Sequence, residues 1–271
     1  MPELPEVETT RAGISPHILN QRVQSFYIRQ PSLRWTIPFD MASYFESYEI
    51  SALTRRGKYL VLSTQSGSAL IHLGMSGSLR ICSEDEPLKK HDHWDMCFQN
   101  GLILRYHDPR RFGAFLWAGK NPEQHKLIAK LGPEPIESDF TSGYIYRLSR
   151  GRSLAIKNFL MSSQTVVGVG NIYASESLFR AGTHPSKPAG KVSLKRYQAL
   201  VLAVKSVLAE AIESGGSTLR DYVNGSGSPG YFQQKLSVYG RTGEPCLDCS
   251  APIRQLKIGQ RSSFYCPQCQ R

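Results

Sequence analysis

The pattern of hydrophobic and polar residues divides the chain into parts with different periodicity. Apolar side chains recur at helical spacing over residues 3–19, interrupted only by Pro5, which the first turn of a helix tolerates. Short stretches with strand character follow, at 22–29, 58–64, 68–72, 78–82, 93–98, 102–107 and 113–117. Because their connections are short, we expect antiparallel pairing in a sandwich or barrel.

The period changes after a segment rich in proline and glycine at 132–135. Helical spacing then dominates at 138–150, 155–162, 171–181 and 193–214. The last of these carries one apolar stripe, formed by Leu200, Val201, Val204, Val207, Leu208 and Ala211. We therefore predict an α+β protein with domains at 1–131, 132–236 and 237–271, the second including a Gly/Ser-rich loop at 215–234.

The last domain contains four cysteines in two C-x2-C pairs, Cys246/Cys249 and Cys266/Cys269. This spacing is typical of one tetrahedral zinc ion held by four thiolates, and a full thiolate set leaves no open position for catalysis. Residues 253–258 and 262–265 alternate like two strands around a Gly-Gln turn, which places Arg261 near the tip of a hairpin. For Cys82 and Cys97 we expect buried free thiols.

Composition and charge narrow the class of partner. The hydrophobic fraction of 40% is ordinary for a globular protein, and no apolar stretch has the length of a membrane span. The acidic start differs from a secretory signal, so we expect a cytoplasmic protein whose cysteines stay reduced. Residues 1–140 hold 16 basic and 16 acidic side chains, so the net charge of +11 lies wholly in residues 141–271. A polyanion, foremost nucleic acid, fits this asymmetry.

Several motifs together resemble one family. PELPEVET stands at 2–9, HLGMSGSLRI at 72–81, KHDH at 90–93, DPRRFG at 108–113 and VVGVGNIYASESLF at 166–179, and the four-cysteine segment closes the chain. This set, in this order, closely resembles formamidopyrimidine-DNA glycosylase. The resemblance implies an N-terminal antiparallel β-sandwich with flanking helices, a helix–two-turns–helix domain and a zinc-finger β-hairpin. It also implies a monomer that removes oxidised purines, such as 8-oxoguanine and formamidopyrimidines, from double-stranded DNA and cleaves the strand at abasic sites by β- and δ-elimination.

The resemblance also assigns catalytic roles. Removal of Met1 would expose Pro2 as a terminal secondary amine, which forms a Schiff base with the sugar. Terminal amines titrate below lysine, but the amine of proline is more basic than most of them, so the surrounding pocket must lower its pKa. Glu3 resembles the general acid, Lys58 the lysine of β-elimination, and Arg261 the arginine of δ-elimination that also binds phosphate. Considered without the family, Glu3 and Glu6 are more simply helix N-terminal acids. We expect Glu6 to keep that structural role.

Other residues match the family's DNA contacts. Met75, Arg110 and Phe112 resemble the side chains that fill the gap left by an everted base. The expected phosphate contacts are His91, Arg152, Lys157 and Asn171. Ser217, Thr218, Arg220 and Tyr222 resemble the lid over the damaged base.

Two other functions remain open at this point. An endonuclease VIII-like enzyme for oxidised pyrimidines shares the Pro-Glu start and the finger, but Leu4 and the trio Met75, Arg110 and Phe112 favour the purine branch. A DNA-binding zinc-finger protein without enzyme activity would account for the charge and the cysteines. Such a protein would not explain the motifs of the N-terminal half.

Overall fold

The computed structural model describes residues 2–216 and 236–271. Contacts divide these residues into two compact units, one made of 2–129 and 214–216 and the other of 130–213 and 236–271. The boundary falls just before the predicted linker at 132–135. The division of the second unit into a helical domain and a finger stays a prediction.

The first unit begins with helix α1 (Leu4–Ile18), close to the predicted bounds. Its N-terminus is a capping box: Glu3 donates its N–H to Glu6 Oε2 at 2.8 Å, and its own side chain accepts from the backbone of Glu6. Pro5 lies in the first turn, where its missing N–H costs nothing. One side of the helix buries Val7, Ile14 and Ile18 in the core of the unit.

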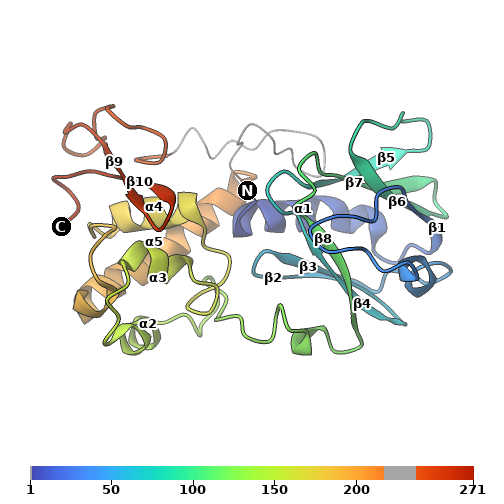
Figure 1. The fold of residues 1–271 in the computed structure, drawn as a ribbon, viewed down its shortest axis with the longest axis horizontal. Coiled ribbons are helices and arrows are strands. Elements are labelled where there is room, and N and C mark those ends of the chain that lie inside the picture. The colour runs from blue at the N-terminus through green and yellow to red at the C-terminus, as the bar shows by residue number, and fades with distance from the viewer. Residues whose placement is uncertain (1, 217–235) are drawn as a thin grey trace. The chain divides into compact units, whose positions relative to one another are not determined.

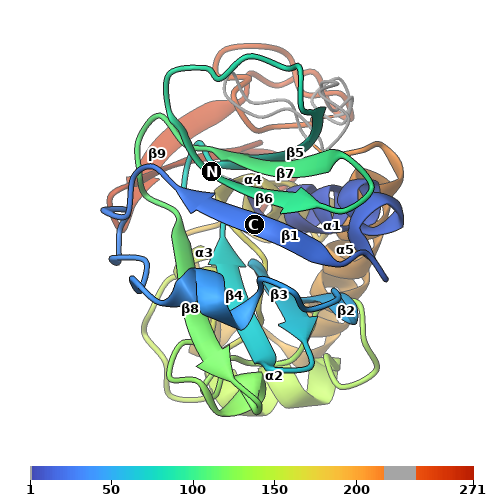
Figure 2. The same cartoon turned by 90° about the vertical axis from the view of Figure 1, so that its right-hand side faces the viewer.

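Two four-stranded antiparallel sheets make up the rest of this unit, in the orders β1-β6-β7-β5 and β2-β3-β4-β8. Figures 1 and 2 show them as two layers. The strands are β1 (Val23–Ile28), β2 (Ala52–Arg56), β3 (Tyr59–Thr64), β4 (Gly67–His72), β5 (Ser78–Ser83), β6 (Asp92–Phe98), β7 (Leu102–His107) and β8 (Ala114–Gly119). The short 3-10 helices η1 (Met41–Tyr44) and η2 (Pro122–Gln124) lie in the connections.

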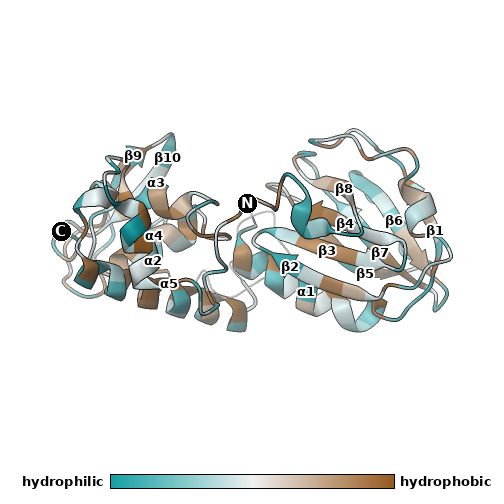
Figure 3. Ribbon diagram, turned by 90° about the horizontal axis from the view of Figure 1, so that it is seen from below, coloured by the Kyte–Doolittle hydropathy of each residue, from teal (hydrophilic) through white to brown (hydrophobic). Residues whose placement is uncertain are grey.

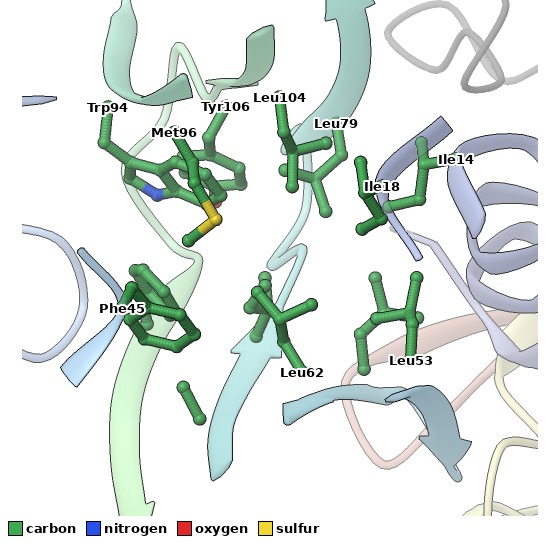
Figure 4. Packing of buried hydrophobic residues seen from close by; sticks show 14 of the residues in the cluster. Ile14, Ile18, Phe45, Leu53, Leu62, Leu79, Trp94, Met96, Leu104 and Tyr106 are labelled. Atoms are coloured by element: carbon green, nitrogen blue, oxygen red, sulfur yellow. The ribbon is translucent and has the colours of Figure 1, made fainter. Parts of the chain in front are cut away.

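The core of the first unit lies between the two sheets and α1 (Figure 4). Trp94 and Tyr106 stack at 5.3 Å between ring centroids, and Trp94 also stacks on Phe115 of the other sheet at 4.9 Å. These rings are fully buried, and burying a large side chain contributes about 1.5–3 kcal/mol. The predicted antiparallel sandwich is confirmed.

Helices dominate the second unit: α2 (Ser142–Ser149), α3 (Ile156–Met161), α4 (Asn171–Arg180) and α5 (Leu194–Glu213), with η3 (Ala189–Lys191) between α4 and α5. The predicted stripe of α5 is buried throughout, and Figure 3 shows hydrophobic residues recurring along this helix between hydrophilic ones. α2 begins later than the predicted residue 138 because Thr141 caps it, its side chain accepting from Tyr144 N at 3.1 Å.

The C-terminal segment forms a hairpin of β9 (Arg254–Ile258) and β10 (Arg261–Tyr265). Gly259 and Gln260 have φ of 52° and 68°, the left-handed pair that a two-residue hairpin turn requires. Phe264 and Ile253 share a small core with Phe179 of α4. The hairpin that was expected between the cysteine pairs is therefore confirmed, with Arg261 directly after its turn.

Candidate active site and DNA-contact residues

The start of the chain places two carboxyl groups beside Pro2. Pro2, Glu3 and Glu6 are all buried, each of the two acids with 2% of its surface exposed. In the capping box Glu6 binds the N–H of Glu3, which gives Glu6 the structural role that was expected. Glu3 caps the helix and is also the acid next in the chain to the predicted nucleophile.

Lys58 lies in the tight turn between β2 and β3, preceded by Gly57 with a φ of 57°. Arg55 connects this turn to α1: its Nε donates to Glu8 Oε2 at 2.8 Å and one terminal nitrogen donates to Gly57 O at 3.1 Å. Burial raises the pKa of Glu8, but hydrogen bonds from Arg11 and Arg55 outweigh it and hold that pKa below its usual range. The ion pair thus fixes the Lys58 turn relative to the helix that begins beside Pro2.

His72, at the end of β4, is a neighbour of Lys58 that the sequence did not single out as a site residue. Its Nδ1 accepts from Gly74 N–H at 3.0 Å, so the remaining ring proton lies on Nε2. Its ring contacts Tyr59 at 4.9 Å between centroids. Burial, and then the charges of Lys58 and Arg34, lower the pKa of His72 to about 4. The imidazole is therefore a neutral group beside a cationic one.

This lowered pKa predicts a pH-dependent stability. His72 has a pKa near 6.5 in the unfolded chain, which therefore binds a proton more readily than the folded protein does. The free energy of unfolding is therefore highest above pH 6.5, where His72 is neutral in both states, and it falls as pH decreases towards 4. Between pH 7.5 and 5 we expect wild type to lose about 2 kcal/mol more unfolding free energy than His72→Asn, which keeps an acceptor near Gly74. Urea unfolding followed by tryptophan fluorescence measures this in the first unit, which contains all three tryptophans. If wild type and His72→Asn lost the same unfolding free energy between these pH values, the lowered pKa of His72 would be contradicted.

The three predicted gap-filling side chains lie on two turns of the first unit. Met75 follows β4 and is 37% exposed, while Arg110 and Phe112 lie between β7 and β8, with Phe112 44% exposed. The Arg110 guanidinium lies over the Phe112 ring, 4.9 Å from its centroid. The exposed chain of Met75 and the exposed ring of Phe112, which lies beside Arg110, suit insertion between bases better than core packing.

His91 lies in the turn before β6, with a φ of 78°. Desolvation, followed by the positive charge of Lys90, lowers its pKa. A neutral imidazole is a hydrogen-bond donor to phosphate at neutral pH without carrying a charge.

The second unit holds the other expected phosphate contacts. Arg152 is exposed in the loop between α2 and α3. Asn171 opens α4 directly after its N-cap, Gly170, and its Nδ2 lies 3.4 Å from the hydroxyl of Tyr239. The N-terminus of a helix carries a partial positive charge, which favours an anion such as a phosphate.

Lys157 is buried completely. Its Nζ donates to Ser262 O at 2.9 Å and to Ser263 Oγ at 2.7 Å, both in β10, next to Arg261. The ammonium group therefore ties α3 to the hairpin. Its expected role as a phosphate contact stays a prediction, one that this burial disfavours. The sequence matched Lys157 to a DNA contact of the family, but it did not indicate that β10 accepts the hydrogen bonds of this lysine.

The four cysteines converge as their spacing predicted. Their Sγ atoms all lie within 4.8 Å of one another, with 3.9 Å between Cys246 and Cys269 and 3.4 Å between Cys249 and Cys266. A tetrahedral zinc ion with Zn–S bonds near 2.3 Å needs sulfur atoms about 3.8 Å apart. The donor set thus fits one structural zinc ion. Cys82 and Cys97 are free, buried in the first case and half-buried in the second.

Part of the predicted site cannot be placed. Ser217, Thr218, Arg220 and Tyr222 lie outside the described residues, as does most of the predicted loop at 215–234. Among the residues that the structure does describe, none of the helices is both long enough and apolar enough to cross a membrane.

Family models match the chain in three segments. Residues 1–115 match the formamidopyrimidine-DNA glycosylase N-terminal domain, 131–223 match the H2TH domain of the same enzyme, and 243–271 match a zinc finger found in FPG and IleRS. The formamidopyrimidine-DNA glycosylases of Methylococcus capsulatus and Syntrophotalea carbinolica are 54% and 56% identical to the chain, in each case over 100% of both sequences.

Solved structures of the same family have a closely similar fold. A Lactococcus lactis FPG variant in complex with Fapy-dG containing DNA has a TM-score of 0.94 at 34% identity, covering 100% of both chains. The MutM (FPG) protein of Thermus thermophilus has a TM-score of 0.88 at 36% identity, covering 99% of this chain and 98% of that one. L. lactis Fpg was also solved with DNA containing an abasic site, at a TM-score of 0.93 and 34% identity, covering 99% of both chains.

Proposed function

Because the chain belongs to the formamidopyrimidine-DNA glycosylase family, we propose that it removes oxidised purines from duplex DNA and cleaves the strand at the abasic site. Family membership over the full length is the observation that carries this proposal. The L. lactis proteins were solved with DNA containing Fapy-dG and with DNA containing an abasic site, which supports the same substrates for this chain. The enzyme acts as a monomer in the bacterial cytoplasm.

Pro2 is the nucleophile of the proposed reaction. Once Met1 is removed, the lone pair of the secondary amine attacks C1′ of the damaged nucleotide, and the base departs with the electrons of the glycosidic bond. Burial of Pro2 and its place before the N-terminus of α1 both favour the neutral amine, because each disfavours a positive charge there. The proline nitrogen then gives up its proton, which neutralises the departed base, and opening of the sugar ring leaves an iminium on Pro2.

Glu3 supplies the proton in this scheme. It donates to the sugar ring oxygen as the C1′–O bond opens, so that no alkoxide has to form. Its position next to Pro2 in the chain supports this role.

Lys58 and Arg261 act after base removal. The iminium acidifies the C2′ proton, and transfer of that proton to a base expels the 3′-phosphate; a second elimination expels the 5′-phosphate. We assign Lys58 to this first elimination as the cation that contacts the departing 3′-phosphate, and the Arg55–Glu8 pair holds the lysine in its turn. For Arg261 the exposed guanidinium supports a phosphate clamp more than proton transfer.

DNA binding rests on residues of both units. Met75, Arg110 and Phe112 fill the gap in the duplex, with Arg110 pairing to the cytosine opposite the lesion. His91, Arg152 and Asn171 contact phosphates, and Lys157 supports Arg261 through the hairpin. Ser217, Thr218, Arg220 and Tyr222 are proposed to recognise the everted base. The zinc ion carries out no step and holds the hairpin in shape.

A panel of duplexes tests the proposal. We expect strand cleavage with 8-oxoguanine opposite cytosine, with formamidopyrimidine and with an abasic site, and much slower cleavage with dihydrouracil. Preference for dihydrouracil would instead indicate the endonuclease VIII-like activity. Binding without cleavage of any of the four would indicate a DNA-binding protein.

Salt dependence tests how the DNA is held. If Lys58, Arg152 and Arg261 each neutralise one phosphate, affinity falls roughly 40-fold between 50 and 200 mM salt. Fluorescence anisotropy with an uncleavable abasic-site analogue measures this fall. A dependence that is flat over this range would contradict phosphate binding by these residues.

A further inference from the structure

Asp108 is a fully buried carboxylate placed between the two turns that carry Met75, Arg110 and Phe112. It directly follows β7, and Arg110 and Phe112 lie just after it in the chain. We propose that Asp108 is a positioning residue that makes these three side chains move and insert as one unit, and thereby sets the preference for the base opposite the lesion. This inference rests on the proposed function.

The carboxylate joins both turns by hydrogen bonds. Its Oδ1 accepts from Ser76 Oγ at 2.7 Å and from Arg110 N at 3.3 Å, and the same Arg110 N–H also lies 3.2 Å from Ser76 Oγ. Its Oδ2 accepts from Gly113 N at 2.8 Å and from Tyr106 Oη at 3.1 Å. Ser76 follows Met75, while Arg110 and Gly113 flank the other turn. The carboxylate thus uses its four acceptor positions on neutral donors, three from the two turns and one, Tyr106, from β7.

The two turns also pack backbone to backbone. A Cβ added at Gly74 would lie 2.4 Å from Phe112 C and 2.5 Å from Gly113 N, and one at Gly113 would lie 1.7 Å from Tyr106 Oη. Gly74 has a φ of 66°, which itself favours glycine. With no space for a side chain between them, one turn cannot shift without displacing the other.

The backbone of Asp108 extends the connection to the His91 turn. Its carbonyl oxygen is 2.7 Å from His93 Nε2, and its N–H donates to His91 O at 3.1 Å. The proposed phosphate contact His91 is therefore held by the same residue as the gap-filling side chains. Asp108 touches none of the reacting atoms and acts through these neighbours alone.

Asp108→Asn is the direct test, because it keeps the shape but replaces one acceptor oxygen by an NH2 group that faces existing donors. We expect single-turnover excision opposite cytosine to fall about 100-fold, as for a misplaced binding group, with a smaller fall opposite adenine. The ratio of the two rates, cytosine over adenine, therefore moves towards one. A purely structural loss would lower both rates equally and leave that ratio unchanged.

Three further measurements make the outcome decisive. Ser76→Ala removes one bond and leaves the carboxylate, so it should change the ratio in the same direction by less. Asp40→Asn is the matched control: Asp40 also accepts from a tyrosine, Tyr44, at 2.6 Å, but belongs to neither turn, so its ratio should stay that of wild type. Insertion is followed by 2-aminopurine fluorescence beside an uncleavable tetrahydrofuran site.

The possible results separate the two claims. If wild type excises no 8-oxoguanine, the proposed function fails, while the insertion signal still tests Asp108. If Asp108→Asn and Ser76→Ala fold, as tryptophan fluorescence would show, and both retain the wild-type ratio and insertion signal, the inference is overturned.

Discussion

A Glu3→Gln variant is expected to bind lesion-containing DNA as wild type does and to excise the base about 10²–10⁴ times more slowly. The glutamine keeps an oxygen that accepts the Glu6 N–H, so the cap of α1 survives. What it loses is the proton that Glu3 is proposed to give to the sugar ring oxygen. Anisotropy on an uncleavable duplex measures binding, and single-turnover rates measure excision.

Glu6→Gln is the control for this experiment. Glutamine at the third helical position still completes a capping box with Glu3 N, so we expect near-normal rates. Equal losses in both variants would assign the two acids to the helix start alone. Loss of binding together with excision in Glu3→Gln would likewise make Glu3 structural.

Removal of zinc is expected to abolish DNA binding while leaving the first unit folded. The apolar cluster of the finger contains few buried residues, and two of them, Cys246 and Cys266, are themselves ligands. Metal binding to a four-cysteine site contributes about 10–16 kcal/mol to folding, far more than this cluster can. Without the ion, β9 and β10 lose their order and Arg261 no longer has a fixed position.

Two readouts separate the units after chelation. Tryptophan fluorescence reports the first unit and should be unchanged, whereas hydrogen exchange in β9 and β10 should rise and DNA affinity should fall. Cys266→Ser should behave as the chelated protein does, and Cys82→Ser, at a cysteine outside the site, should retain affinity. Undiminished binding after complete zinc release would contradict a structural role.

Much of this fold was predictable from periodicity. Strand β7 and helix α5 lie within a residue of their predicted bounds because each buries a clear apolar pattern. Strand β2 was missed, since among its residues Leu53 alone is buried and its arginines resemble a loop. It forms because β3 offers a partner edge, a cause that lies in the tertiary structure and not in its own residues.

The residues of the site divide in the same way, into those that a local pattern predicts and those that depend on tertiary contacts. The cysteine ligands were predictable because spacing along the chain determines their convergence. The hydrogen bonds of Lys157 to β10, of Arg55 to Glu8 and of Asp108 to two turns join residues far apart in sequence, so no local pattern signals them. The neutral state of His72 depends likewise on burial and on Lys58.

The central claim is that Pro2 is the nucleophile, and borohydride trapping tests it most directly. The protein, with Met1 confirmed absent by mass, is incubated with a duplex containing 8-oxoguanine opposite cytosine, reduced, digested and mapped by mass spectrometry. We predict one covalent DNA adduct, on the peptide that begins at Pro2, and a nicked strand in the unreduced sample. An adduct on Lys58 or another lysine, or excision without any adduct, would contradict the account.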